Sequence, residues 1–278
     1  MKITNAINNI PAIQSGGSVT FNLPVGIRYH GFNLFLSSAG VRTAVTAANL
    51  TRVRVTIDTV TLIDWDYASL FLYAQSRGIP LSVGQIPVYF TDPLLVGLRN
   101  AYAGSIDTKQ GITNVQVYIL IGAVTTPTLT GELIFDFLQN TKPVWTNGVK
   151  SIQASNTPLM KTAQVENIPL INGYQIADIS NNYPLDTLIM YNGADAFITY
   201  IRLQLNGLVI FEGSPQDIAR DFLAYGIQNP VGSIVLPFTY DRFSPNSAAA
   251  FTTISITVNS TTAFAMGLAI VTQLPSIT

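Results

Sequence analysis

The sequence contains no cysteine, and histidine occurs only once, as His30. Disulfides, thiolate metal sites and a cysteine nucleophile are therefore excluded, and multi-histidine metal sites and most general-base schemes lose their key residue. The sequence also lacks a Gly-x-Ser-x-Gly elbow, a glycine-rich phosphate-binding loop and an acid spacing typical of glycosidases. These absences predict a protein that is not an enzyme and that has no catalytic, cofactor-binding or metal-binding residue.

Charge of either sign is also scarce. Only 10% of the 278 residues are charged, against about 25% in typical domains, and 14 basic and 15 acidic residues give a formal net charge of −1. Such a chain has no general attraction to nucleic acid or to an anionic membrane. Apolar runs such as 117–124 and 263–271 fall far short of the ~20 residues that span a bilayer. The first residues lack the apolar core of a signal peptide.

What the sequence has in excess is apolar character. Apolar residues make up 48% of the chain, and the mean hydropathy of +0.35 is high for a soluble monomer. Two interpretations stay open. Apolar surface of this extent is buried between subunits or against another large body, or the chain builds a large core in two apolar β domains. A length of 278 residues makes two domains the default expectation.

Short segments with strict in-and-out alternation run through the chain. Period-two alternation rich in β-branched and aromatic residues is typical of half-buried antiparallel strands. Glycine (20 residues) and proline (15 residues) fall between these segments at short intervals. The pattern predicts an all-β sandwich or barrel, and its clearest segments are 19–23, 53–57, 115–119, 201–205 and 254–258.

Three segments interrupt the strands with helix signals. Asp66 precedes a stretch that stops at Gly78, and Ser214, followed by a proline, begins one that stops at Gly226. A third candidate spans 92–103. A capping side chain at the start and a glycine at the end are typical of short helices. Since no phosphate-binding glycine loop precedes any of them, we interpret all three as structural.

The two halves of the chain repeat each other. The strand around Arg54 aligns with the strand around Arg202 at a constant spacing, the repeat offset, and the same offset pairs Gly78 with Gly226 without a gap. A period of about half the chain indicates two copies of a whole domain. We therefore expect two superposable sandwiches, with the two arginines at equivalent strand positions and the two glycines ending equivalent helices at positive φ.

The seam between the copies is expected between residues 137 and 166. This stretch is polar, carries two prolines and has little periodicity, which is typical of a linker. A boundary after Lys142 gives predicted domains of residues 1–142 and 143–278.

The opening of the chain carries short motifs. Residues 8–17 read Asn-Asn-Ile-Pro-Ala-Ile-Gln-Ser-Gly-Gly and lead into a strand that ends Leu-Pro-Val-Gly at residues 23–26. This stretch resembles the start of the corticovirus coat protein. With its two tandem sandwiches, each carrying an inserted helix, the chain resembles the double jelly-roll major capsid proteins of tailless icosahedral, membrane-containing bacteriophages of the corticovirus and finnlakevirus kind.

The resemblance implies a structural virion protein. Its fold would be two tandem eight-stranded antiparallel jelly rolls with short inserted helices, an N-terminal roll over 1–142 and a C-terminal roll over 143–278. Three copies would form a pseudo-hexameric homotrimer that tiles an icosahedral shell over an internal lipid membrane. Expected partners are neighbouring trimers, penton or spike proteins, minor capsid proteins and lipid, but no specific nucleic acid. The protein would be made in the host cytoplasm and reside in the capsid.

A different class of function stays open as the alternative. A two-domain β-sandwich could be a binding protein, such as a phage spike or a carbohydrate-binding adhesin. The 14 Phe, 12 Tyr and 2 Trp could line a carbohydrate platform, although in a double sandwich such residues are more typical of core and interface.

His30 and several acids are the candidate site residues. His30 follows a predicted strand with no acid near it in sequence, so we expect it to be structural or merely exposed. Glu132 and Asp136 would act as an acid pair only on a helix, and the residues between them indicate a strand.

Calcium and lipid are the two ligands that this protein could be expected to contact. The corticovirus resemblance implies an association with calcium, without a motif that can be placed on these residues. Asp64-Trp65-Asp66 could offer two carboxylates, but an Asp-x-Asp-x-Asp-Gly loop is lacking and Asp66 is expected to cap a helix. Lys2 could touch lipid headgroups. We expect the segment 1–13 to precede the first firm strand and to lie on the inner face of the shell.

Overall fold

The computed structural model describes residues 2–91, 104–109, 111–137, 141–146, 149–154, 160–180, 185–238 and 253–274. The helix expected over 92–103 lies outside them. Within these ranges, no helix is long and apolar enough to span a membrane.

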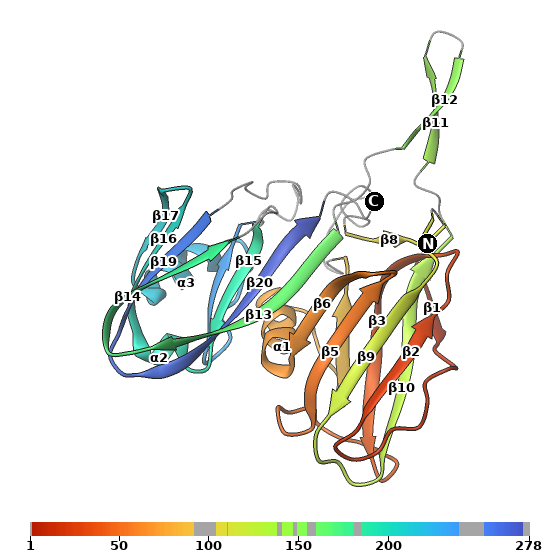
Figure 1. Ribbon diagram of the computed structural model, residues 1–278, viewed down its shortest axis with the longest axis horizontal. Coiled ribbons are helices and arrows are strands. Elements are labelled where there is room, and N and C mark those ends of the chain that lie inside the picture. Colours follow the sequence, from red (N-terminus) through yellow and green to blue (C-terminus); the bar gives the residue numbers. More distant parts are fainter. Residues whose placement is uncertain are drawn as a thin grey trace.

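The first jelly roll, called the first roll below, is built from two antiparallel sheets (Figure 1). One sheet has the order β1-β10-β3-β7 and the other the order β2-β9-β5-β6. The short strands β4 (Val41–Arg42) and β8 (Ile106–Asp107) pair with the two ends of β3. The main strands are β1 (Ile3–Ala6), β2 (Ser18–Leu23), β3 (Arg28–Ser38), β5 (Leu50–Ile57), β6 (Val60–Asp66), β7 (Gln85–Tyr89), β9 (Val115–Ile121) and β10 (Pro127–Asp136).

The second jelly roll, called the second roll, repeats this arrangement strand for strand. Its sheets have the orders β13-β20-β15-β18 and β14-β19-β16-β17. The expected fold of two tandem eight-stranded jelly rolls is therefore confirmed for the described residues. The strands are β13 (Met160–Leu170), β14 (Gly173–Ser180), β15 (Leu185–Tyr191), β16 (Ile198–Leu205), β17 (Leu208–Gly213), β18 (Ile234–Pro237), β19 (Thr253–Ser260) and β20 (Phe264–Leu274).

Alternation in the sequence becomes the wall of each core. In β5, Val53, Val55 and Ile57 are fully buried on one face, while Arg52 and Arg54 lie on the other. Burying a side chain of this size contributes about 1.5–3 kcal/mol, which fixes the strand register because a slip of one residue would turn the apolar set outward. The core thus explains why the sequence pattern predicts the strands so well.

The inserted helices obey the repeat offset. They are α1 (Tyr67–Ser76) and α3 (Pro215–Leu223), whereas α2 (Ala194–Phe197) is a single turn. Asp66 caps α1 by accepting from Ser69 N, and Ser214 caps α3 by accepting from Asp217 N. The expected glycines follow, with φ of 68° at Gly78 and 74° at Gly226. Both predictions about the helix ends are confirmed.

The central strands β3 and β15 can be aligned through a shared hydrogen bond. Phe90 N donates to the carbonyl of His30 (3.0 Å), and Phe238 N, its counterpart at the repeat offset, donates to the carbonyl of Asp186 (2.8 Å). His30 and Asp186 therefore occupy equivalent positions in the two rolls.

The segment between the rolls differs from the expected linker. Strands β11 (Thr141–Thr146) and β12 (Val149–Ala154) pair in an antiparallel hairpin that stands apart from both rolls (Figure 1). The stretch that has the sequence character of a linker thus contains a regular hairpin, which the sequence pattern did not predict. The predicted boundary after Lys142 falls within β11 and stays a prediction.

The N-terminal segment also differs from expectation. Residues Ile3–Ala6 form β1, which pairs with β10 at the edge of the first sheet. The expectation that 1–13 precedes the first firm strand is therefore wrong. A strand of four residues, three of them exposed, is too short to show a periodic pattern.

Candidate functional site

The two rolls meet at a junction where their sheets become continuous. Strand β6 of the first roll pairs in parallel with β13 of the second, with Ile63 opposite Ala163. One eight-stranded sheet, in the order β18-β15-β20-β13-β6-β5-β9-β2, therefore runs through both rolls (Figure 1). This parallel contact fixes the second roll against one edge of the first.

Helix α1 of the first roll reinforces the junction through a buried ion pair. Arg77 directly follows α1, and its side-chain Nη2 donates to Asp186 Oδ1 (3.0 Å) and to Thr187 Oγ1 (2.8 Å) in β15. Arg77 is 3% exposed and Asp186 1%. Removing one partner of such a pair would leave an uncompensated buried charge, which costs about 3–5 kcal/mol.

A second buried contact joins the start of α1 to β15. Tyr191 Oη donates to Asp66 Oδ2 (2.8 Å), and the other oxygen of this carboxylate caps α1. Burial, reinforced by the charge of Asp66, holds the pKa of Tyr191 above its ordinary value, so the phenol stays a donor. The Tyr191 ring lies so close to Gly267 of β20 that any Cβ there would collide with it. The junction is therefore closely packed as well as hydrogen-bonded.

The junction changes the burial of the second roll's outer sheet face. Gly31 and Thr187, one residue after the equivalent His30 and Asp186, pair with Ile134 of β10 and Val271 of β20. Strand β20 is buried on both faces from Met266 to Thr272, whereas β10 leaves alternate residues exposed or half-buried. The same face is thus covered in the second roll and open in the first.

His30 lies inside the first roll, against an acid that the sequence did not indicate. Its Nε2 is 2.6 Å from Asp136 Oδ2, and both side chains are buried. Burial lowers the pKa of His30, although the hydrogen bond to Asp136 opposes this shift. The structural interpretation of His30 is confirmed and the exposed alternative is wrong. Asp136 was missed as its partner because it lies 106 residues away.

The structure confirms that the two acids four residues apart lie on a strand and not on a helix. Glu132 and Asp136 both belong to β10, with Asp136 buried and Glu132 half-buried. Lys2, just before β1, is exposed. Its contact with lipid stays a prediction.

Asp64 and Asp66 do not converge. Asp64 pairs with Arg52 and lies 3.1 Å from Arg54 Nη2, while Asp66 serves α1 and Tyr191. Among the residues that the structure describes, no group of three or more His, Asp or Glu could hold a metal ion. Calcium binding stays a prediction without an assigned site.

The repeat extends to the ion pair on the exposed sheet face. Arg202 and Glu212, the counterparts of Arg54 and Asp64 at the repeat offset, lie 3.9 Å apart. The prediction that the two arginines occupy equivalent strand positions is confirmed.

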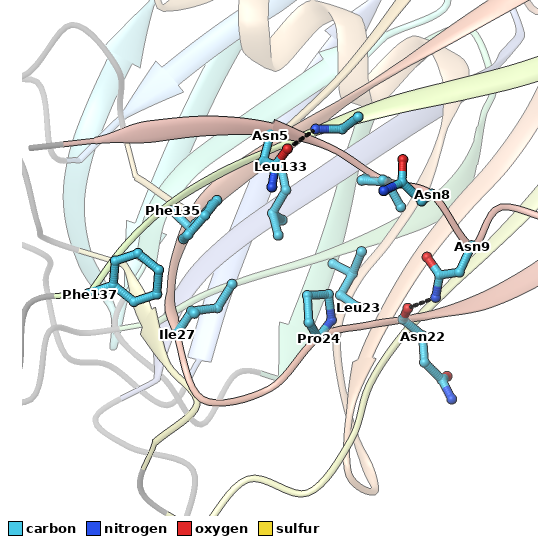
Figure 2. A pocket seen from close by; sticks show the side chains of 12 residues that line it. Asn5, Asn8, Asn9, Asn22, Leu23, Pro24, Ile27, Leu133, Phe135 and Phe137 are labelled. Carbon is cyan, nitrogen blue, oxygen red and sulfur yellow. Dashed lines mark hydrogen bonds between the residues drawn. The ribbon is translucent and has the colours of Figure 1, made fainter.

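A pocket of about 600 Å³ opens at the β1 edge of the first roll (Figure 2). Its lining mixes apolar side chains, including Leu133 and Phe135 of β10, with asparagines. Asn9 Nδ2 donates to the carbonyl of Asn22 (2.5 Å) and ties the segment after β1 to the end of β2. Nothing in the sequence pattern indicated this pocket, because its walls come from three separated segments. The full lining is Asn5, Ala6, Ile7, Asn8, Asn9, Asn22, Leu23, Pro24, Ile27, Leu133, Phe135 and Phe137.

Known proteins share both the sequence signature and the architecture. Residues 4–133 match the family model of the viral coat protein P2 N-terminal domain. The crystal structure of the major capsid protein P2 from bacteriophage PM2 has a TM-score of 0.77 at 16% identity, over 98% of this chain and 97% of that one. A search of curated proteins finds no match.

Two further solved structures show the same double fold. The crystal structure of the STIV MCP (Sulfolobus turreted icosahedral virus) has a TM-score of 0.66 at 11% identity, covering 99% of this chain and 97% of that chain. PBCV-1 VP54 has a TM-score of 0.67 at 12% identity, covering 98% and 94%. The resemblance to double jelly-roll major capsid proteins is confirmed. The family-model match adds a likeness in sequence: residues 4–133 are similar to the N-terminal domain of a viral coat protein.

Proposed function

We propose that this chain is the major capsid protein of an icosahedral virus, and that three copies form a pseudo-hexameric block. The observation that carries the proposal is the doubling itself: two rolls of identical strand order, joined by a buried junction. Three such chains present six similar rolls, so one gene product can fill a hexagonal net. Heterologous contacts between copies close into a ring when the rotation at each contact is right.

The physical properties of the surface support this function. Large obligate interfaces need flanks that are weakly charged and partly apolar, and only 10% of the residues are charged. Several large apolar side chains are exposed on β17, on α3 and in the segment after it: Leu208, Ile210, Leu223, Tyr225 and Val231. An exposed set of this size indicates contact with other copies rather than a free surface.

The surroundings of the block follow from the same proposal. The protein would be made in the host cytoplasm and reside in the shell, where it meets neighbouring trimers, penton or spike proteins, minor capsid proteins and an internal membrane. Lys2 is a candidate contact for lipid headgroups, although one lysine contributes only about 1 kcal/mol. Structural calcium between copies would be held by carboxylates that neighbouring chains contribute together. The protein would have no enzymatic activity.

Native mass spectrometry of the purified full chain tests the proposal. A stable trimer is expected. A monomer with an intact fold would contradict the proposal, and a monomer that binds glycans on an array would favour the alternative of a spike or adhesin.

A further inference from the structure

We propose that the second roll of one copy docks on the first roll of another copy by repeating the junction inside each chain, with β17 added in parallel to the free edge of β1. The pocket of Figure 2 is then covered by β17 of a second copy. The inference rests on the proposed function, because it names the surfaces through which the copies of the capsid block meet.

The two strands are the unused counterparts of the pair that forms the junction. Inside the chain, β6 of the first roll pairs with β13 of the second. Strand β17 is the counterpart of β6 at the repeat offset. Strand β1 is the counterpart of β13, because β1 pairs with β10 and β13 pairs with β20, the last strand of each roll. Among the described strands, β17 and β1 each lie at the end of a sheet. Free edges carry unpaired N–H and C=O groups that another chain can complete.

The repeat also sets the register of the new pairing. Ile63 of β6 lies opposite Ala163 of β13, and Phe211 is the counterpart of Ile63 at the repeat offset. Ala163 pairs with Val271 of β20. The equivalent of Val271 is Ile134, which pairs with Thr4. The pairing between copies should therefore place Phe211 opposite Thr4.

One position on these edges shows what a neighbouring strand covers. Leu62 and Ile210, which are counterparts at the repeat offset, are the extra residues of matching β-bulges in β6 and β17. Leu62, flanked by β13, is 1% exposed, whereas Ile210 on the free edge is 40% exposed. A β-bulge at a sheet edge re-aims a side chain. We infer that a second copy removes Ile210 from water in the same way that β13 removes Leu62 from water.

The pocket provides the receiving surface. Asn5 and Ala6 of β1 belong to its lining, and Ile27, Leu133 and Phe135 form part of its apolar wall (Figure 2). Since β1 forms part of the lining, a strand added to β1 brings the exposed apolar side chains of β17 close to the pocket. Burying Ile210 there would be favourable by the ordinary hydrophobic effect.

Charge on the neighbouring face is complementary as well. Phe35 of β3 is equivalent to Tyr191, the residue that contacts the start of α1 in the junction, and the Arg42 guanidinium lies 4.0 Å from the Phe35 ring centroid. The same docking between copies brings α3 toward Arg42, and the exposed face of α3 carries two acids, Asp217 and Asp221, against the one Arg220 that pairs with both. A cation on one surface and an acid on the other favour this orientation.

An engineered disulfide tests the register directly, because the chain has no cysteine of its own. One residue after Phe211 and Thr4, Glu212 and Asn5 should face each other between copies. Neighbouring strands hold Cα atoms within the range that a disulfide spans. The full-length double variant Asn5→Cys/Glu212→Cys is oxidised and run on a denaturing, non-reducing gel, where covalent trimers are expected.

Two matched variants serve as controls. Asp64→Cys/Gln164→Cys, one residue after Ile63 and Ala163, should link within a chain and run as a monomer. Glu212→Cys/Thr128→Cys places one thiol on an exposed position of β10 away from the β1 edge, and it should not cross-link.

The outcomes separate this inference from the proposed function. Trimers that native mass spectrometry detects but that Asn5→Cys/Glu212→Cys does not link would overturn the docking geometry and leave the capsid function standing. A wild-type chain that is monomeric would overturn both.

A substitution that adds no thiol gives an independent readout. Ile210→Asn should raise the concentration at which trimers dissociate at least ten-fold, with an unchanged circular dichroism spectrum. Ile171→Asn changes an apolar residue that is even more exposed, in the turn between β13 and β14, and it should change the dissociation concentration less than two-fold. Equal effects of the two substitutions would contradict the proposed docking.

Discussion

Helices α1 and α3 are built alike but covered differently. Both have a side-chain cap and both end before a glycine of positive φ, and α1 packs on β7 as α3 packs on the equivalent β18. In α1 and its C-cap, a second face is buried by β15 of the other roll. The residues of this face are Ser69, Tyr73 and Arg77, whereas the equivalent Asp217, Asp221 and Tyr225 of α3 are exposed.

The sequence of each helix therefore matches what covers it, although the two helices have the same place in their rolls. The face of α1 that is buried within the chain carries a serine, an aromatic residue and an arginine with a buried partner. The same face of α3 carries two acids and a tyrosine, which suit a surface that is solvated before assembly. Equivalent positions in the two rolls can therefore be mutated in pairs, with one copy serving as the control for the other.

The largest difference is expected at Arg77 and Tyr225. Arg77→Ala leaves Asp186 buried without its partner and should lower the free energy of unfolding by about 3–5 kcal/mol. Tyr225→Ala removes a half-exposed side chain and should cost less than about 1 kcal/mol in the dissociated chain. Denaturant titration at low protein concentration measures both. Equal losses would show that the ion pair does not hold the junction.

The next difference is expected at Gly267 and Thr130, which face Tyr191 and Phe35 on equivalent strands. Gly267→Ala places a Cβ against the Tyr191 ring and should destabilise the chain by about 1–3 kcal/mol. Thr130→Ala changes an exposed residue and should stay within about 0.5 kcal/mol. Thermal unfolding of both variants checks this prediction. The close packing at the junction would be refuted by a Gly267→Ala variant as stable as the wild type.

The two helix caps should differ for the same reason. Ser214→Ala removes a cap and should cost about 1 kcal/mol. Asp66→Ala removes a cap and also leaves the buried Tyr191 phenol without its acceptor, which adds about 1–3 kcal/mol. The difference between the two variants in chemical unfolding isolates the contribution of Tyr191. A loss at Asp66 no greater than the loss at Ser214 would contradict a role for this contact in joining the rolls.

The smallest effect concerns pH and the equivalent pair His30 and Asp186. Burial depresses the pKa of His30 in the folded chain below its unfolded value of 6.5. Below about pH 6.5 the unfolded chain takes up a proton on His30 more readily than the folded chain does. The free energy of unfolding should therefore fall as the pH drops, with a slope of at most about 1.4 kcal/mol per pH unit. His30 is the only histidine, so His30→Gln should remove this slope. A wild type of constant stability between pH 7 and 5.5 would contradict the assignment.

Features that depend on local pattern could be predicted from the sequence. The repeat offset aligned Arg54 with Arg202, and the caps and glycines fixed the helix ends, because each signal lies within a few residues of the element it marks. The strands of the core followed from alternation, since burial of one face imposes a period of two residues.

Features that depend on contacts between distant segments could not be predicted. The partners Arg77 and Asp186 are 109 residues apart, and His30 and Asp136 are 106 apart. Each residue alone has the character of an ordinary surface charge, and only the topology of the rolls brings it to its buried partner. Strand β1 was missed for a similar reason: its register is set by β10, at the far end of the first roll's sequence.

In the proposed assembly, the junction within one chain and the contact between chains are versions of one arrangement. Single-particle electron cryomicroscopy of the purified oligomer tests it most directly. We predict three chains whose six rolls form one ring, with β17 of each copy beside β1 of the next. A monomer, a ring with another number of chains, or a trimer that leaves the β1 edge and its pocket open would contradict the claim.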